Sequence, residues 1–366
     1  MTFQTDFQHL ASHFNFKGEF LRAEPYGHGH INDTYRLFFE RTDGSLKKYI
    51  LQRINKFVFQ NPAGLMKNIE AVTSHLSQKV IADGGDLERE TLTLVPTRAG
   101  QSFHLSEDGQ YWRSYHFIEK AIAYQVPASL KHVYHAARAF GNFQYILDDF
   151  PATDLSETIP DFHNTPKRFE DCLRALDADP HHRARDVKDE VNFILQRKDE
   201  LMVVVELIKQ GRLPVRVTHN DTKFNNVLLD ERTGVGVCII DLDTVMPGSV
   251  LYDFGDAIRS IANTAEEGQR DLSKVHFDLD VFDQYVRGYL DVFGHSLTST
   301  ELDLLAFSAR LMTLECGIRF LTDHLNGDVY FRIQRENHNL HRCRAQFKLV
   351  QEMEVHYSAM QRIIER

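Results

Sequence analysis

Long hydrophobic runs are missing from this chain of 366 residues. No apolar stretch approaches the roughly 20 residues that a helix needs to cross a bilayer. The first residues, MTFQTDFQHLASHF, do not place a basic region before a long apolar one, as a secretory signal does. These absences argue against a membrane partner, and we expect a cytoplasmic protein.

Closely spaced cysteines are missing as well. The four cysteines are scattered and form no CxxC pair: Cys172, Cys238, Cys316 and Cys343. Disulfide frameworks and zinc ribbons depend on such regular spacing. We therefore expect free thiols in a reducing compartment.

An excess of positive charge is also lacking. The chain has 42 lysines and arginines against 52 aspartates and glutamates, so its formal net charge is -10. No basic stripe is visible that would neutralise the phosphates of a nucleic acid, which excludes a general nucleic-acid binder. To bind an anionic ligand, such a chain must concentrate cations, backbone N–H groups or a metal ion at one place.

The first third of the chain has the pattern of β-strands. Aromatic and β-branched residues gather in short runs, separated by turn clusters such as RTDGS and SEDGQ. Residues 63–82 interrupt this pattern, because Leu65, Ile69, Val72 and Leu76 follow helical spacing. We predict an antiparallel sheet with one helix, whose strands cover residues 34–40, 48–54, 92–97, 102–107 and 110–118.

After Glu119 the periodicity becomes mostly helical. Helical patterns cover residues 129–150, 184–211, 252–264, 275–293, 299–325 and 344–365. Short strands are expected only at residues 215–218, 226–230 and 236–241. We predict an α+β chain with a β-rich lobe at residues 1–118, a hinge near 115–120 and a helical lobe at 119–366. The ligand would lie in the cleft between the lobes.

Residues 217–248 carry the densest group of chemically active side chains. In chain order this segment contains His219, Asp221, Lys223, Asn226, Asp241 and Asp243. The spacing repeats the H-R-D-x-x-x-x-N loop and the later metal-binding aspartate of protein kinases, although D-F-G itself is absent. These groups suit the binding of a metal-bound triphosphate and the removal of a proton from an attacking hydroxyl. Together with the order of strands and helices, they indicate a bilobal, protein-kinase-like fold.

Four of these residues have an expected chemical role. Asp221 is the candidate catalytic base, and the ammonium of Lys223 would reach the γ-phosphate or the Asp221 carboxylate. Asn226 and Asp241 offer the hard oxygen ligands that Mg²⁺ prefers. The plainer alternative is ordinary turn chemistry with a solvated lysine. The shared spacing favours the functional interpretation.

Four other polar residues are expected to have structural roles and to take no part in the chemistry. His219 would pack and hydrogen-bond the loop, and Asp243 is a bystander unless it provides a second metal contact. Asp253 and Asp256 in YDFGDAIR would begin a helix and brace the catalytic loop, because a helix N-terminus favours carboxylates.

The nucleotide is expected to meet a glycine loop and the connector between the lobes. Gly27 and Gly29 of GHGHINDT let the backbone approach phosphates, although a plain hairpin turn has the same composition. A Rossmann site is excluded because no helix opens after the loop. In the connector, backbone groups near Phe117 and Glu119 would pair with the adenine edge.

The third strand departs from the kinase pattern. A lysine there normally contacts the α- and β-phosphates and pairs with a glutamate of the following helix. The corresponding YILQRIN offers Gln52 and Arg53 instead, and only one of them can face the nucleotide because side chains alternate along a strand. We expect Arg53 to be the cation, with Glu70 as its partner. The alternative is that Gln52 faces inward and Arg53 is solvated.

Nearly the whole chain resembles the aminoglycoside phosphotransferase and choline kinase superfamily, and within it the N-acetylhexosamine 1-kinases. The resemblance rests on EPYGHGHINDTY, YILQRIN, NIEAVTSHL, HNDTKFNN, IIDLDTVMPGS and GIRFLTDHLNGDVYF. It implies that His30 and Asp33 contact the phosphates and the sugar, and that Arg319 and Tyr330 line the sugar pocket. An intra-lobe salt bridge and a core tyrosine are the structural alternatives for the last two.

These observations predict an ATP- and Mg²⁺-dependent kinase of a small hydroxylated molecule. The resemblance implies transfer to the anomeric hydroxyl of GlcNAc or GalNAc, giving the sugar 1-phosphate. Another sugar, choline, ethanolamine, homoserine or an aminoglycoside is the alternative acceptor. A nucleotide-binding pseudokinase is the alternative from a different class, and the missing strand lysine is its only support.

Overall fold

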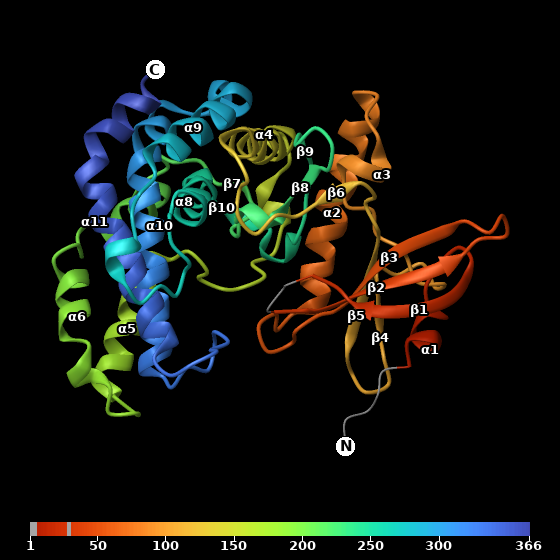
Figure 1. Cartoon of the computed structure of the whole chain (residues 1–366), viewed down its shortest axis with the longest axis horizontal. Helices are drawn as coiled ribbons and strands as arrows, with labels where there is room; N and C mark the ends of the chain where they lie inside the picture. Colours follow the sequence, from red (N-terminus) through yellow and green to blue (C-terminus); the bar gives the residue numbers. More distant parts are fainter. Residues whose placement is uncertain (1–5, 28–30) are drawn as a thin grey trace.

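The structure of the chain is a computed structural model that describes residues 6–27 and 31–366. Its first part is a five-stranded antiparallel sheet with the order β1-β2-β3-β5-β4, preceded by the short helix α1 (Phe7–Ala11) (Figure 1). The strands are β1 (Glu19–Pro25), β2 (Asp33–Glu40), β3 (Leu46–Arg53), β4 (Phe103–Leu105) and β5 (Tyr111–His116). The predicted strand at 92–97 forms only two isolated bridges, from Leu94 to Tyr115 and from Thr97 to Phe14. Pro96 lacks the N–H that a ladder needs there.

One face of this sheet buries an aromatic core of its own. Phe14, Phe39, Tyr49 and Trp112 are all nearly inaccessible and pack against Leu37 and Leu51. Alternation along β3 places Tyr49 and Leu51 on this face, so that Gln52 points to the other side. The polar face of the sheet is therefore the one that turns towards the rest of the molecule.

Helix α2 (Pro62–Ala82) connects the sheet to the helical part. It begins with Asn61 as N-cap, accepting a hydrogen bond from the Gly64 nitrogen, and with Pro62 in its first turn. The buried Asn68 side chain donates to the carbonyl oxygens of Ser156 at 2.7 Å and Val245 at 3.0 Å. These bonds tie the helix to two segments far along the chain.

After β5 the chain leaves the first sheet and enters the helical part. β6 (Ala121–Ile122) pairs with β8 (Val227–Asp230), which pairs with β9 (Gly236–Ile239). β7 (Arg216–Thr218) and β10 (Met246–Gly248) form a separate two-stranded ladder. The loops between β7, β8, β9 and β10 contain every candidate residue of the central motif.

Eight helices complete this part, most of them on the side of the short strands away from the first sheet (Figure 1). They are α4 (Leu130–Ile146), α5 (Thr165–Ala178), α6 (Lys188–Leu195), α7 (Val203–Lys209), α8 (Val250–Ile261), α9 (Leu279–Phe293), α10 (Ser299–Leu325) and α11 (His338–Ile364). A short helix α3 (Leu87–Glu90) follows α2. The predicted long helix at 184–211 is divided, because the chain turns after α6, where Arg197 pairs with Glu354 of α11 at 2.8 Å.

Helix α10 lies at the centre of the helical part, with α8 and α11 packed against it. Gly255 makes the crossing of α8 and α10 possible, since a Cβ atom there would lie 2.4 Å from the Ser308 carbonyl oxygen. Across the described residues, none of the helices combines the length and the apolarity of a membrane span.

Candidate active site

Asp253, in the first turn of α8, anchors the loop between β7 and β8. The two oxygens of this buried carboxylate accept hydrogen bonds from the backbone nitrogens of His219 at 2.9 Å and Asn220 at 2.7 Å. Thr222 donates its hydroxyl to the Asp253 carbonyl at 2.5 Å. Asn220 takes a left-handed φ of 64°, which turns the chain towards Asp221. The structure thus brings Asp253 to the loop, as the sequence predicts.

His219 is a structural residue in this arrangement. It is fully buried, and its ring nitrogen Nε2 lies 2.9 Å from the carbonyl oxygen of Ile240, at the end of β9. The ring centroids of Phe140 and Phe143 lie 6.0 and 5.9 Å from that of His219. His219 therefore joins the catalytic loop to the segment that carries Asp241.

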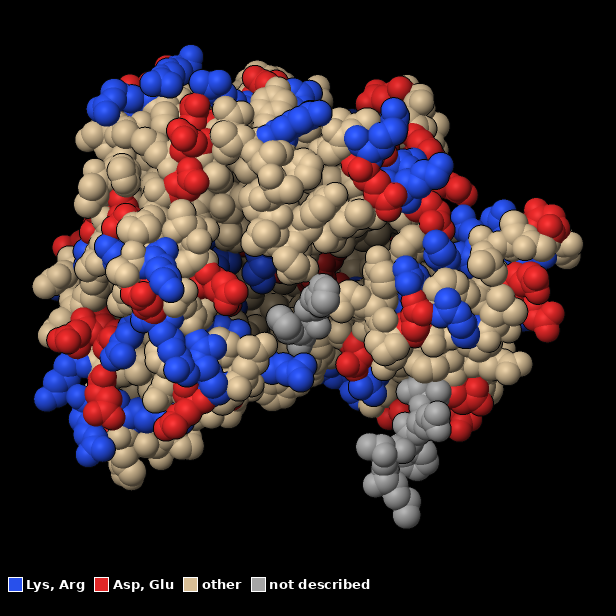
Figure 2. Space-filling model, in the orientation of Figure 1, with Lys and Arg blue, Asp and Glu red and all other residues tan. Residues whose placement is uncertain are grey.

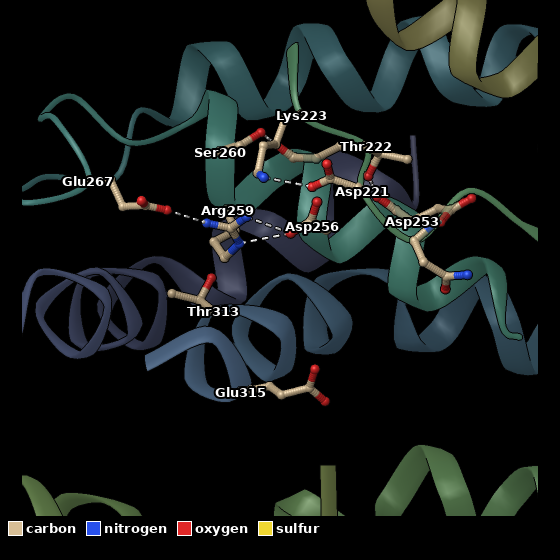
Figure 3. Close-up of polar contacts among 12 residues, drawn as sticks. Asp221, Thr222, Lys223, Asp253, Asp256, Arg259, Ser260, Glu267, Thr313 and Glu315 are labelled. Atoms are coloured by element: carbon tan, nitrogen blue, oxygen red, sulfur yellow. Dashed lines mark hydrogen bonds and ion pairs between the residues drawn. The ribbon is translucent and has the colours of Figure 1, made fainter. Parts of the chain in front are cut away.

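Asp221 projects from this loop with a cation and an amide on its carboxylate. Lys223 Nζ lies 2.8 Å from Oδ1, and Asn226 Nδ2 donates to Oδ2 at 3.0 Å. Burial raises the pKa of the carboxyl, but Lys223 outweighs that effect and holds the pKa of Asp221 below its ordinary value. Figure 3 shows Lys223 and Asp221 pointing towards one another, beside Asp256 and Arg259. The carboxylate is therefore ionised and available as a proton acceptor.

Asn226 and Asp241 are brought together by the backbone. The Ile240 nitrogen donates to the Asn226 carbonyl at 2.9 Å, and Asp241 follows in a left-handed conformation with φ of 61°. Partial loss of hydration, together with the nearby carboxylates of Asp243 and Asp221, raises the pKa of Asp241 to about 7, although the residue is exposed to solvent in the structure. Such a concentration of negative charge attracts a cation.

The described residues include no cluster of three or more His, Cys, Asp or Glu side chains suited to a metal ion. Mg²⁺ does not need one, because it keeps several waters and binds through one or two protein oxygens plus substrate phosphates. Asn226 turns its amide nitrogen to Asp221, which leaves the amide oxygen free to be a ligand. The pair of Asn226 and Asp241 therefore fits Mg²⁺ brought in with a nucleotide.

Asp256 and Arg259 extend the site along α8. Arg259 donates through Nε and Nη2 to Oδ1 of Asp256, at 2.9 and 2.6 Å, and also lies 3.5 Å from Glu267 (Figure 3). The second oxygen of Asp256 is buried and has no hydrogen-bond partner among the described residues. Asp256 thus offers an unused acceptor beside Lys223.

On α10, Arg319 occupies a half-buried position between two aromatic rings. Its guanidinium carbon lies 4.6 Å from the ring centre of Phe162 and 5.6 Å from that of Phe331. No carboxylate within the described ranges forms an ion pair with it. Tyr330 stands next to Phe331 with centroids 4.8 Å apart and is 36% exposed. The structure thus brings Arg319 and Tyr330 to one side of the helical part. Among the described residues Arg319 has no salt bridge within the lobe, and Tyr330 is too exposed to be a core residue, so neither structural alternative is found.

The sequence profile described as "Phosphotransferase enzyme family" matches residues 22–289. This span covers the sheet, the catalytic loop and the helices up to α9. The chain belongs to the phosphotransferase enzyme family.

Solved structures with the same fold include several phosphotransferases. A microcompartment-associated aminopropanol kinase is 14% identical, covers 97% of each chain and has a TM-score of 0.63. An aminoglycoside phosphotransferase from Alicyclobacillus acidocaldarius is 12% identical, covers 93% of this chain and 92% of its own, with a TM-score of 0.61. A spectinomycin phosphotransferase solved with ADP and spectinomycin is 13% identical, covers 99% of this chain and 100% of its own, and has a TM-score of 0.55. These likenesses confirm the predicted α+β kinase-like fold.

In this phosphotransferase the surface is hollowed between the sheet and the helical part, and acidic side chains are visible within the hollow (Figure 2). Gly27 in the glycine loop takes a φ of +80°, which suits glycine, whereas the predicted contacts at Gly29 and His30 lie outside the described residues. Asn32, farther along the loop, donates to Asp243 at 2.5 Å.

The expected ion pair between Arg53 and Glu70 is corrected by the structure. Asp33 lies directly opposite Arg53 in the ladder of β2 and β3, and it accepts from Arg53 Nε at 2.9 Å. Both side chains are largely exposed, and Glu70 lies on the exposed side of α2. Gln52 is the residue that faces inward. Asp33 thus has a protein partner in the structure, and its contact with a sugar remains a prediction.

The connector residues follow the end of β5 and contact the neighbouring strand β3. The Phe117 nitrogen donates to the Lys48 carbonyl at 3.3 Å, and Glu119 forms an exposed ion pair with Lys48 at 3.0 Å. The Glu119 carbonyl accepts from Arg89 at 3.1 Å. An adenine contact at Phe117 and Glu119 remains a prediction.

Two residues of the site were not found from the sequence. Arg113 of β5 is fully buried and forms an ion pair with Asp243, and Asn32 contacts the same carboxylate. Asp243 is therefore not the bystander we expected. A usable signal was present, because a single arginine within the apolar strand QYWRSYHFI requires a buried acidic partner.

Proposed function

We propose that this phosphotransferase is an ATP- and Mg²⁺-dependent kinase of an N-acetylhexosamine, which phosphorylates the anomeric hydroxyl of GlcNAc or GalNAc. The observation that carries the proposal of kinase chemistry is the carboxylate of Asp221, held ionised by Lys223 at 2.8 Å and oriented by Asn226 at 3.0 Å. The choice of sugar rests on the acceptor side of the site and on the resemblance to the N-acetylhexosamine 1-kinases.

In the proposed reaction, the anomeric hydroxyl donates its proton to Asp221 as its oxygen bonds to the γ-phosphorus. The bond from that phosphorus to the bridging oxygen breaks, and ADP leaves with the bond electrons. Little base strength is required, because the transition state is loose and the anomeric hydroxyl is more acidic than an ordinary alcohol. Asn226 and Asp241 would hold Mg²⁺, which supplies electrostatic stabilisation of the phosphates when bound.

The acceptor side supports a neutral, hydroxylated substrate. Arg319 lies between Phe162 and Phe331 without an acidic partner, and burial of its guanidinium is outweighed by neighbouring groups, above all Tyr330, that raise its pKa. It therefore stays charged, and a permanently charged arginine repels cationic acceptors such as choline or an aminoglycoside. Hydroxyl and N-acetyl oxygens of the substrate can accept its hydrogen bonds.

An acceptor panel tests this proposal. ADP release should be measured with ATP, Mg²⁺ and each of GlcNAc, GalNAc, glucose, choline, ethanolamine, homoserine and kanamycin. We expect kcat/KM to be highest for one of the two N-acetylhexosamines. A higher kcat/KM for a cationic acceptor would overturn the choice of substrate. Nucleotide binding without turnover of any acceptor would favour the pseudokinase alternative.

A further inference from the structure

Strand β5 contains a buried cation that the proposed chemistry does not yet use. Arg113 is 1% exposed and is the largest of the fully buried side chains in the described structure. Its neighbours in the strand, Trp112 and Tyr115, are buried aromatic residues. A buried charge is costly unless it is paired and hydrogen-bonded. The partners of Arg113 therefore indicate why the residue is there.

Arg113 contacts the polar face of the sheet on one side. It lies directly opposite Gln52 in the ladder of β3 and β5, and its Nε donates to the Gln52 side-chain oxygen at 3.0 Å. The Gln52 side-chain nitrogen donates in turn to the Thr34 hydroxyl at 3.0 Å. Thr34 is at the start of β2, where the glycine loop ends.

On the other side Arg113 reaches the segment that follows β9. Its Nη1 forms an ion pair with Oδ1 of Asp243, which is also buried. The second oxygen of Asp243 accepts a hydrogen bond from Asn32 at 2.5 Å, and the side-chain oxygen of Asn32 accepts from the Asn55 nitrogen at 3.0 Å. Asp243 is thus held by strand β5 and by the glycine loop together.

These contacts form a closed path that begins and ends in the same loop. Its members, in order, are Asn32, Asp243, Arg113, Gln52 and Thr34. Asp241, a proposed metal ligand, is two residues before Asp243 and in a left-handed conformation. Because the path begins at Asn32 and ends at Thr34, it couples the segment Asn32–Thr34 to the segment that carries Asp241 and Asp243.

Arg113 also brings a positive charge next to Gln52, on the strand that lacks the lysine's charge. A kinase strand lysine supplies a cation beside the phosphates, and an uncharged Gln52 cannot. Arg113 supplies a cation from the neighbouring strand, next to Gln52. Its carboxylate partner is Asp243 and not a glutamate of α2, where Glu70 is exposed. Because Arg113 is buried and directs its Nε to Gln52 and its Nη1 to Asp243, we infer that it acts through Asp243 and does not itself touch the nucleotide.

We propose that Arg113 is a positioning residue of the nucleotide site, which compensates for the missing strand lysine by fixing Asp243, and through it Asp241 and the segment Asn32–Thr34, beside metal-bound ATP. This inference rests on the proposed use of a nucleotide, but not on the identity of the acceptor.

Three variants separate this role from a structural one: Arg113→Met, Asp243→Asn, and the two together. The single Arg113→Met leaves a buried carboxylate unpaired, so its melting temperature should fall. In the double variant neither charge is present, and the melting temperature should recover towards that of the wild type. Arg113→Lys, which keeps a charge but loses the guanidinium geometry, should lie between Arg113→Met and the wild type.

The deciding measurement is the dissociation constant of Mg²⁺-ATP by calorimetry, together with KM for ATP and for GlcNAc. We expect the double variant to bind Mg²⁺-ATP at least tenfold more weakly while KM for GlcNAc changes less than twofold. A double variant that regains both stability and wild-type affinity for Mg²⁺-ATP would overturn the inference, because the pair would then be purely structural.

A matched control is the pair of Arg197→Met with Glu354→Gln. This ion pair joins the segment after α6 to α11, on the side of the helical part away from the sheet (Figure 1). Its removal should leave Mg²⁺-ATP binding unchanged. Because the calorimetric titration needs no acceptor, it remains decisive if GlcNAc and GalNAc are not substrates. Failure of the sugar assay alone overturns the proposed acceptor and leaves the test of Arg113 intact.

Discussion

The ammonium of Lys223 lies 2.8 Å from the carboxylate of Asp221, in a loop whose backbone is anchored to the first turn of α8. The pair keeps Asp221 ionised within a recessed site. A base of this kind orients a hydroxyl and accepts its proton late, which suits phosphoryl transfer.

Replacing Asp221 with Asn should lower kcat by at least about 100-fold, because general-base groups contribute about 10²–10⁴-fold. The dissociation constant of Mg²⁺-ATP should change little, since the amide keeps the size of the carboxylate. Steady-state kinetics and nucleotide titration check the two parts. Asp303→Asn, an exposed change on α10, serves as the control and should behave as the wild type. Near-normal kcat in Asp221→Asn would contradict the assigned role.

Replacing Asp241 with Asn should raise the Mg²⁺ concentration needed for half-maximal activity by roughly tenfold or more, because a neutral amide oxygen binds a hard cation more weakly than a carboxylate oxygen does. Asn226→Ala should act in the same direction, as it removes the other proposed ligand. EDTA should abolish turnover of the wild type, and added Mg²⁺ should restore it. An unchanged Mg²⁺ requirement in both variants would place the metal elsewhere.

The change Arg319→Met should raise KM for the sugar by about 10–100-fold, the effect of losing one hydrogen bond to a charged group. KM for ATP should stay within about twofold, because Arg319 lies on α10 and not beside the glycine loop. The surface arginine Arg287 on α9 provides the matched Met control. Equal changes in both KM values would indicate a general structural effect.

The support of the catalytic loop should be sensitive to acid. Glu315 of α10 is buried and lies 2.7 Å from His163, whose other nitrogen lies 3.1 Å from the Asn220 carbonyl. Burial raises the pKa of Glu315, but His163 and Thr165 outweigh this effect and lower it below the ordinary value of 4.5. The carboxylate therefore stabilises the folded state above about pH 4.5, and this contribution is lost as the pH falls below that value.

Glu315→Gln should therefore lower the free energy of unfolding by about 3 kcal/mol at pH 7, the cost of breaking a buried pair. Its stability should also fall less steeply than that of the wild type below pH 4.5. Chemical denaturation at a series of pH values measures both. Glu266→Gln, at an exposed position, should reproduce the wild-type curve. If the free energies of unfolding of Glu315→Gln and the wild type depend on pH in the same way, protonation of Glu315 does not cause the loss of stability in acid.

Much of the chemical core could be predicted from the sequence because its groups lie close together in the chain. Asp221, Lys223 and Asn226 share one loop, and a short hairpin brings Asp241 back to it. Such local geometry follows from spacing alone. The alternation of β3 likewise showed that only one of two neighbouring residues could face inward.

Which of the two faces inward depends on partners that are distant in sequence. Asp33 stands opposite Arg53 and draws it to the exposed side, while Arg113, 61 positions from Gln52, binds that amide on the inner side. The pair of Arg113 and Asp243 joins strand β5 to the turn after β9, far along the chain. Spacing carries no information about such contacts, and only the strand register places them.

Identification of the product tests the central proposal most directly. The wild-type protein should be incubated with ATP, Mg²⁺ and GlcNAc or GalNAc, and the product examined by ³¹P and ¹H NMR. The account predicts a phosphorus signal coupled to the anomeric proton of the sugar, which would be absent when Asp221→Asn replaces the wild type. A phosphorus signal coupled to the protons at C6, or no sugar phosphate beside efficient phosphorylation of another acceptor, would contradict it.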